Sequence, residues 1–439
     1  MSGQTSEIAA QIGGITGHRA RRLGPLARRA GWNVADQVMS AGSNFALSVA
    51  VARVVDANSF GAFSIAFVAF GLANGVQRAV VGQPLQIRHS ADLPDAFRIN
   101  VGRALGATAV LGIAMGALAA GAGAFVSGEP RAALWAVAAC LPALVLQDAC
   151  RMAFFAARNP RGAFVLDLVW TVLLALGLAV AVTVGLTGTA ALVLIWGLSA
   201  AAAVAVGLAA LHVRPRVRMA VPWARDNRSL AAFLTGEFLL GVGVSQAAIL
   251  VTGALAGAAA AGSLRGAQVL LGPVGILGAA VLAFAVPELV KRRSMPPARR
   301  LRAGALVSVT VGVTGLVYLA VVLLLPEAMG RTLLKDTWPG ARSVLLPMGL
   351  VMVCAALGAG AGVLLYSGGH ARHTFLVNSV KAPLLLAAVV FGAVVAGAWG
   401  TAVALAAVEA AMLPAWLWVA WRKTVSPTEG DAAVLGARA

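Results

Sequence analysis

The chain has 439 residues, of which 60% are hydrophobic and only 11% are charged. Soluble domains carry roughly 25% charged residues, so this composition excludes a water-facing surface around several soluble domains. It argues against a soluble enzyme and, despite a net charge of +18, against a partner made of nucleic acid. We expect a multi-pass membrane protein whose basic residues gather in cytoplasmic loops.

Apolar runs of helical length follow one another along almost the whole chain. A bilayer core of about 30 Å needs roughly 20 apolar residues per helix. On this criterion the sequence predicts an all-α membrane protein with twelve transmembrane helices. In chain order the spans are Trp32–Ala52, Phe60–Gly82, Val101–Val126, Ala132–Ala157, Ala163–Leu186, Ala190–Val213, Leu230–Leu255, Ala259–Pro287, Ala303–Leu325, Ser343–Tyr366, Thr374–Ala396 and Trp399–Ala420.

The basic residues between these spans alternate in number from loop to loop. With the N-terminus inside, the predicted inside segments hold five times as many Lys and Arg residues as the outside loops. Since cytoplasmic loops of membrane proteins are enriched in these residues, we expect both termini to be cytoplasmic. Residues 1–31 form a basic tail, which is either an interfacial helix or a loose segment.

Short motifs indicate that the two halves of the chain are copies of one unit. Arg161–Asp167 opens the fifth predicted span, and Arg372–Asn378 opens the eleventh with Arg and Phe at matching positions. Six is an even number, so both copies enter the membrane from the same side as a parallel repeat. The predicted organisation is an N-terminal six-helix lobe over 32–213, a basic cytoplasmic linker over 214–229, a C-terminal six-helix lobe over 230–421 and a cytoplasmic tail over 422–439.

The sequence carries none of the common catalytic motifs. It has no phosphate-binding loop of the GxxxxGK[ST] type, no HExxH, no Gly-x-Ser-x-Gly elbow and no Cys/His cluster with metal-ligand spacing. We therefore expect no catalytic residues, no metal, no cofactor and no enzymatic activity.

Basic side chains within the spans are the first group of candidate functional residues. A charge at the bilayer centre costs at least about 2.5 kcal/mol unless it faces a partner or a wet cavity. Arg78, Arg265 and Lys381 are therefore candidates for cations that line a substrate cavity. Arg151 follows Asp148 by three residues, one helical turn, which favours a structural ion pair.

Acidic side chains within the spans are the second group. Glu237 and Glu409 lie deepest, and with Asp36 they are candidates for coupling transport to protons or sodium ions, or for ion pairs with the buried bases. Asp36 and Asp167 lie within about one turn of the predicted cytoplasmic boundary. A carboxylate at a helix start is also favoured by the helix dipole, so a purely local role for these two stays open.

Several stretches of the first half resemble the polysaccharide (O-antigen type) flippases, a family of the multidrug/oligosaccharidyl-lipid/polysaccharide (MOP) exporter superfamily. They are the segment from Asp36 through Ala52-Arg53 to Phe60-Gly61, the Gln77-Arg78-Ala triplet, the Gly82-Gln-Pro84-Leu exit, and the segments Leu146–Phe155 and Arg158–Asp167. The second half fits by its pattern of spans.

This resemblance implies two six-helix lobes around a central cavity that opens alternately to either side. It implies a polyprenyl-diphosphate-linked oligosaccharide as substrate, moved from the inner to the outer leaflet of a bacterial inner membrane. Its implied partners are this lipid-linked glycan, membrane lipids, and a glycan polymerase or glycosyltransferases. Arg78, Arg265 and Lys381 would then supply cations for the pyrophosphate.

Two other functions stay open on the sequence. An ion-coupled, MATE-like multidrug exporter of the same superfamily has the same number of spans, and Glu237, Glu409 and Asp36 would attract its cationic substrates. A scaffold for an envelope glycan synthesis complex would need no transport at all.

Overall fold

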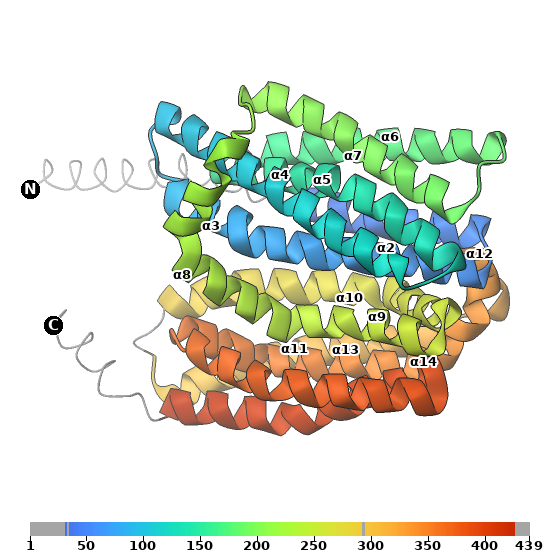
Figure 1. Ribbon diagram of the computed structural model, residues 1–439. Coiled ribbons are helices and arrows are strands. Elements are labelled where there is room, and N and C mark those ends of the chain that lie inside the picture. The colour runs from blue at the N-terminus through green and yellow to red at the C-terminus, as the bar shows by residue number, and fades with distance from the viewer. Residues whose placement is uncertain (1–30, 33–34, 292–294, 426–439) are drawn as a thin grey trace, which may run out of the picture.

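The computed structural model describes residues 31–32, 35–291 and 295–425. Within these ranges the protein is helical and contains no strand. Most of the predicted N-terminal tail, residues 1–30, and residues 426–439 of the predicted C-terminal tail lie outside the described residues. The helices run side by side in two bundles, with the blue-to-green N-terminal half above the yellow-to-red C-terminal half in Figure 1.

The N-terminal bundle starts with a helix over residues 35–54. Asp56 then caps the next helix, accepting hydrogen bonds from the backbone N–H groups of Asn58 (2.8 Å) and Ser59 (3.0 Å). Proline at the first helical position starts two others at Pro94 and Pro160. The elements are α2 (Ala57–Gln77), the π-helical turn η1 (Arg78–Gly82), α3 (Gln83–His89), α4 (Pro94–Ala124), α5 (Gly128–Ala156), α6 (Pro160–Thr183) and α7 (Thr189–Leu211).

The C-terminal bundle follows a short turn, η2 (Val217–Met219). A second π-helical turn interrupts the first long helix of this bundle, and a short amphipathic helix separates two long helices later in the chain. The elements are α8 (Ala220–Phe238), η3 (Leu239–Gly243), α9 (Val244–Ala256), α10 (Ala258–Lys291), α11 (Pro297–Leu323), α12 (Glu327–Leu334), η4 (Lys335–Thr337), α13 (Trp338–Ser367) and α14 (Ala371–Val425).

The last element, α14, reverses direction in its middle. Ala396 (φ −143°) and Gly397 (φ +57°) leave the helical region, and glycine adopts a positive φ without a steric penalty. On either side of this turn Gly392 and Gly400 pack so closely that a Cβ on Gly400 would stand 2.1 Å from the Gly392 carbonyl oxygen. The turn therefore lies between the two spans that the sequence predicts there, Thr374–Ala396 and Trp399–Ala420.

Nine helices of the described part of the chain are long and apolar enough to cross a membrane. The helix over 35–54 and α10 are not among these nine, and the whole of Arg372–Val425 counts once although it turns back. The fold class of a multi-pass all-α membrane protein is thus confirmed, whereas the number of twelve spans stays a prediction. We name the two ends of the bundles by the predicted cytoplasmic and outer sides.

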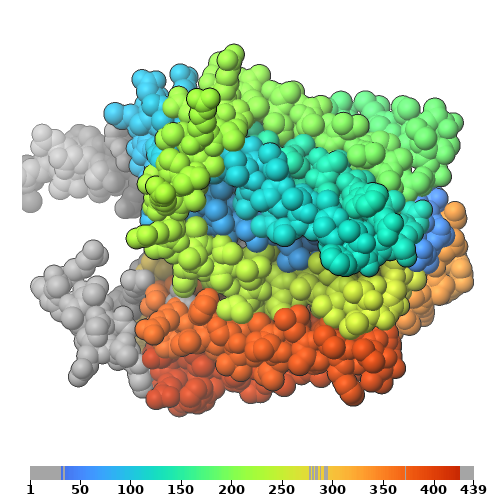
Figure 2. Space-filling model, viewed as in Figure 1, coloured from blue at the N-terminus to red at the C-terminus, as the bar shows by residue number. Residues whose placement is uncertain are grey.

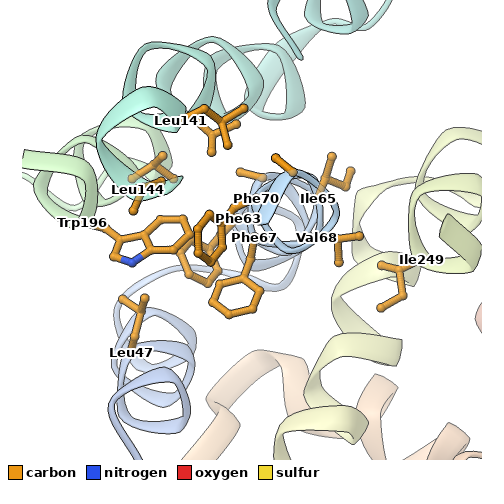
Figure 3. Close-up of a cluster of buried hydrophobic side chains, with 14 of the residues drawn as sticks. Leu47, Phe63, Ile65, Phe67, Val68, Phe70, Leu141, Leu144, Trp196 and Ile249 are labelled. Atoms are coloured by element: carbon orange, nitrogen blue, oxygen red, sulfur yellow. The ribbon is translucent and has the colours of Figure 1, made fainter. Parts of the chain in front are cut away.

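Aromatic packing fixes α2 in the N-terminal bundle. Phe67 stacks on Trp196 of α7 with ring centroids 5.5 Å apart, and Phe70 meets the same indole edge-on at 4.9 Å. Figure 3 shows these rings together on one side of α2, while Val68 points away from them toward Ile249 of α9. Helix α2 therefore has one face in its own bundle and another against the C-terminal bundle.

The two bundles touch closely at the predicted outer side. A Cβ on Gly61 of α2 would stand 1.8 Å from the carbonyl oxygen of Ala258, at the start of α10. Only glycine allows two backbones to approach this far, as at other close helix crossings in membranes. At the predicted cytoplasmic side Arg88 bridges the bundles by donating to the Asp226 carbonyl oxygen (2.6 Å), and the Trp223 indole donates to the Val80 carbonyl oxygen (3.3 Å).

Candidate functional site

Arg265 is a guanidinium placed between the two bundles. It lies on α10, its carbon Cζ is 4.0 Å from the centroid of the Phe67 ring, and Nη2 donates to Ser48 Oγ at 3.4 Å. In the described part of the chain no carboxylate comes within ion-pair distance of it, and its Nε has no partner. Phe67 thus contacts both Trp196 and Arg265, and the ring face supplies only part of the counter-charge that this cation needs.

Two amide side chains near this seam also carry unpartnered oxygens. Gln246 of α9 lies beside Gly71 of α2, with its Nε2 3.8 Å from the position of a Cβ on Gly71. Gln246 Oε1, and Oδ1 of Asn74 one turn beyond Gly71, are buried without a hydrogen-bond partner in the described residues. Since buried polar atoms are nearly always paired, these oxygens and the Arg265 Nε mark places where a ligand or water would be bound.

A long apolar groove runs along the opposite face of α2. It holds about 1130 Å³ and is bounded by α2 and α4 of one bundle and by α9 of the other. Ile65, Ala69 and Leu72 line it from α2, about half a helical turn away from Phe67. In Figure 2 part of the blue helix is seen at the bottom of the hollow between teal α4 and α5 and yellow-green α9.

A network of charges, buried except at Arg78, occupies the N-terminal bundle. Arg78, in η1, makes a bidentate ion pair with Asp148 of α5, through Nε (2.8 Å) and Nη2 (2.6 Å). Arg151, one turn further along α5, donates Nε to Asp36 at 3.0 Å and contacts the same carboxylate through Nη2. The predicted contact between Asp148 and Arg151 is present at 3.5 Å, although each has a closer partner elsewhere.

Asp167 of α6 completes this network. Its Oδ1 accepts a hydrogen bond from Gln147 (2.8 Å), and its Oδ2 lies 3.3 Å from Arg151 Nε without hydrogen-bond geometry. Asp36 Oδ1 and Asp167 Oδ2 are buried with no hydrogen-bond partner in the described residues. Three carboxylates thus face two guanidinium groups, so the network carries one excess negative charge when all five groups are ionised.

The structure places the remaining predicted site residues in separate pairs. Lys381 donates to Glu409 at 2.8 Å, across the two halves of α14, and the two side chains are 11% and 13% exposed. Glu237 of α8 accepts a hydrogen bond from the Tyr366 hydroxyl (2.8 Å). No recorded contact in the described residues joins Lys381 to Arg265, so Arg265 is the member of the predicted cation set that lacks an acidic partner there.

Sequence reasoning brought some of these residues together and missed others. It paired Asp148 with Arg151 by spacing, but it gave no reason to bring Arg78, Asp36 and Asp167 to the same network. Asp36 lies in the first turn of the helix over 35–54, whereas Asp167 lies about two turns inside α6, and both carboxylates are buried, at 0% and 2% exposed. The missed polar groups at the seam are Asn74 and Gln246, and an amide within an apolar run was the signal available for both.

Comparisons with known proteins place this geometry within one fold. No protein-family model matches the chain, and no curated protein matches it either. Among solved structures the chain is similar to a MATE-family multidrug resistance transporter in an inward-facing conformation, with 11% identity over 88% of this chain and 94% of that chain and a TM-score of 0.62. It is similar to the lipid II flippase MurJ in an inward closed conformation, with 9% identity, 89% of each chain covered and a TM-score of 0.67.

A third similar structure is a MOP superfamily transporter from Pyrococcus furiosus, described as having a binding pocket of reverse polarity that suggests a different function. It is 10% identical over 91% of this chain and 95% of that chain, with a TM-score of 0.53. These similarities confirm the predicted MATE-like fold. Membership of the MOP superfamily, and of the polysaccharide flippase family within it, stays a prediction.

Proposed function

We propose that this chain is a flippase that moves a polyprenyl-diphosphate-linked oligosaccharide, or a related lipid-linked glycan, from the inner to the outer leaflet by alternating access. The observation that carries this proposal is Arg265, a guanidinium between the two bundles without an acidic partner in the described residues. A pyrophosphate supplies the missing counter-charge and can accept paired hydrogen bonds from one guanidinium. The amides of Asn74 and Gln246 offer further hydrogen bonds to a sugar.

The pairing of the predicted site charges favours an anionic substrate over the cations of a multidrug exporter. Two of the acids that would attract a cation are occupied, since Glu409 is paired with Lys381 and Glu237 accepts from Tyr366. The fold is compatible with both, because its structural neighbours include multidrug transporters and a lipid II flippase. A multidrug exporter is therefore the second candidate, and a glycan-synthesis scaffold the third.

The buried network supports a proposal for coupling. One excess negative charge and two unpartnered carboxylate oxygens, on Asp36 and Asp167, favour the uptake of a proton or a sodium ion. Arg78 connects this network to η1, which packs against α8 of the other bundle. Uptake of a cation would thus change the charge balance beside the seam across which the two bundles move.

The proposal is tested with the purified full chain in liposomes that contain a fluorescent polyprenyl-diphosphate oligosaccharide. A membrane-impermeant quencher then reports how much of the probe reaches the outer leaflet. We expect flipping by the wild type, and a loss of about tenfold or more in Arg265→Gln, because a hydrogen bond to a charged group is worth about 1.5–3 kcal/mol. Arg265→Lys should retain part of the rate.

The matched control is Arg342→Gln, which removes another arginine that lies over an aromatic ring, 5.6 Å from the centroid of Trp338, but is itself exposed. Equal rates in the wild type and in Arg265→Gln would overturn the role of this cation. A wild type that moves a small organic cation but not the lipid-linked sugar would be a multidrug exporter, and one that moves neither would favour the scaffold.

Coupling is tested in the same liposomes with an imposed proton or sodium gradient. We expect one of the two gradients to accelerate flipping in the wild type, and Asp167→Asn to abolish that acceleration while exchange without a gradient continues. Acceleration that survives in both Asp36→Asn and Asp167→Asn would refute a coupling role for this network.

A further inference from the structure

A second groove lies on the N-terminal bundle, between the helix over 35–54 and α6. It holds about 570 Å³, within the range of roughly 300–1,000 Å³ that is usual for ligand pockets. Its walls carry small side chains, Ala46 and Ala50 on one helix and Ala175 and Ala179 on the other, and Leu192 of α7 contributes to its lining. Arg53 is the only charged residue among those that line it.

The groove extends over one leaflet of the membrane. On the first helix its lining runs from Ser43 to Val54, and on α6 it runs from Thr171 to Val182. Each stretch covers eleven residue steps, or about 16 Å at 1.5 Å per residue, which is half of a hydrocarbon core of about 30 Å. Both helices end at the predicted outer side, so Arg53 and Val182 lie at the headgroup end of the groove and Ser43 and Thr171 lie near the middle of the bilayer.

The polar groups at the inner end of the groove already have hydrogen-bond partners within the protein. The Ser43 hydroxyl donates to the Ser40 carbonyl oxygen (3.0 Å), and the Thr171 hydroxyl donates to the Asp167 carbonyl oxygen (2.7 Å). Each of these bonds lies within its own helix, and the other side chains that line the inner end are hydrocarbon. An occupant of this part of the groove is therefore an apolar chain.

The outer end is different, because Arg53 is exposed and no hydrogen bond or ion pair of its side chain is recorded in the described residues. The nearest acid in the sequence, Asp56, is already engaged, since its carboxylate accepts from the backbone N–H groups of Asn58 and Ser59 and from the Ser59 hydroxyl. A guanidinium at headgroup level above an apolar groove complements a lipid with one phosphate above an acyl chain.

We infer that this groove is a binding site for an anionic phospholipid of the outer leaflet, with an acyl chain between the helix over 35–54 and α6 and the phosphate on Arg53. The site is separate from the proposed substrate site, because Ser48, which contacts Arg265, lies on another face of the same helix and does not line the groove. A lipid held there would fasten the first helix to α6 and so stabilise the N-terminal bundle.

The test is native mass spectrometry of the purified full chain, with phosphatidylglycerol as the probe and phosphatidylcholine as its zwitterionic comparison. We expect one tightly bound phosphatidylglycerol per chain and weaker binding of phosphatidylcholine. Arg53→Gln should lower phosphatidylglycerol binding by about fivefold, the effect of one cation near a membrane surface, and Arg53→Lys should largely retain it.

A second variant tests the apolar part of the groove. Ala179→Phe fills it from an exposed position on α6 and should release the tightly bound lipid, whereas Leu176→Phe, an exposed position on the same helix outside the groove, should not. Unchanged binding in either Arg53→Gln or Ala179→Phe would overturn the inference. Tenfold tighter binding of polyprenyl phosphate at the same site would also overturn it, because the occupant would then be the substrate lipid. A dimer that Ala179→Phe dissociates would do the same, because the occupant would then be a second copy of the chain. None of these outcomes depends on transport activity.

Discussion

Removal of the Arg151 charge should destabilise the protein more than removal of any exposed arginine. The Arg151 side chain is 4% exposed and serves three carboxylates, with Nε 3.0 Å from Asp36, Nη1 3.5 Å from Asp148 and Nε 3.3 Å from Asp167. In Arg151→Gln these three acids would share one remaining arginine, Arg78, and the network would carry two excess negative charges. Breaking a buried ion pair in this way costs about 3–5 kcal/mol.

The control for this prediction is Arg331→Gln, the same substitution in an exposed pair. Arg331 lies 2.9 Å from Glu327 one helical turn away, and both side chains are 55% exposed, so its loss should cost about 0–1 kcal/mol. The measurement is denaturant or thermal unfolding of the purified chain in detergent. Asp36→Asn added to Arg151→Gln should restore part of the stability, with a coupling of about 0.5–3 kcal/mol. Equal losses in Arg151→Gln and Arg331→Gln, or purely additive effects in the double variant, would refute the charge count.

Two further predictions concern the N-terminal end of α2. Gly61→Ala places a Cβ 1.8 Å from the Ala258 carbonyl oxygen, so the bundles must separate at the predicted outer side. The expected cost is about 1–3 kcal/mol, with greater labelling of cysteines introduced at that seam, whereas Gly42→Ala, within a helix and with nothing within 4 Å, should neither lower stability nor raise labelling. Asp56→Ala should cost about 1 kcal/mol at neutral pH. Hydrogen bonds from Ser59 hold the pKa of Asp56 below its usual value, so this contribution is complete above the unfolded pKa of about 3.9 and is lost as the pH falls through the lower folded value. Unfolding scans of both proteins between pH 3 and 8 should converge only at the acid end, and a difference that persists unchanged at pH 3 would contradict the cap.

The sequence by itself determined the class of protein and most of the helices. A helix that crosses a bilayer needs about 20 apolar residues, and its backbone must form hydrogen bonds within the helix because lipid offers none. Transmembrane helices are therefore visible in a single sequence as long apolar runs. Positions such as Pro94, Pro160 and Gly397 mark helix ends for local steric reasons, and the structure begins or turns helices there. Spacing by one turn likewise sufficed for the contact between Asp148 and Arg151.

Only the tertiary structure decided which charges meet. Asp36 and Arg151 are 115 residues apart and Lys381 and Glu409 are 28 apart, and no local pattern carries the rotation and register with which their helices pack. The same holds for Arg265, whose lack of an acidic partner among the described residues is a property of the seam between α10, α2 and the helix over 35–54. Helix positions in a membrane protein follow from hydrophobicity along the chain, whereas charge pairing depends on side-chain packing between helices that are distant in sequence.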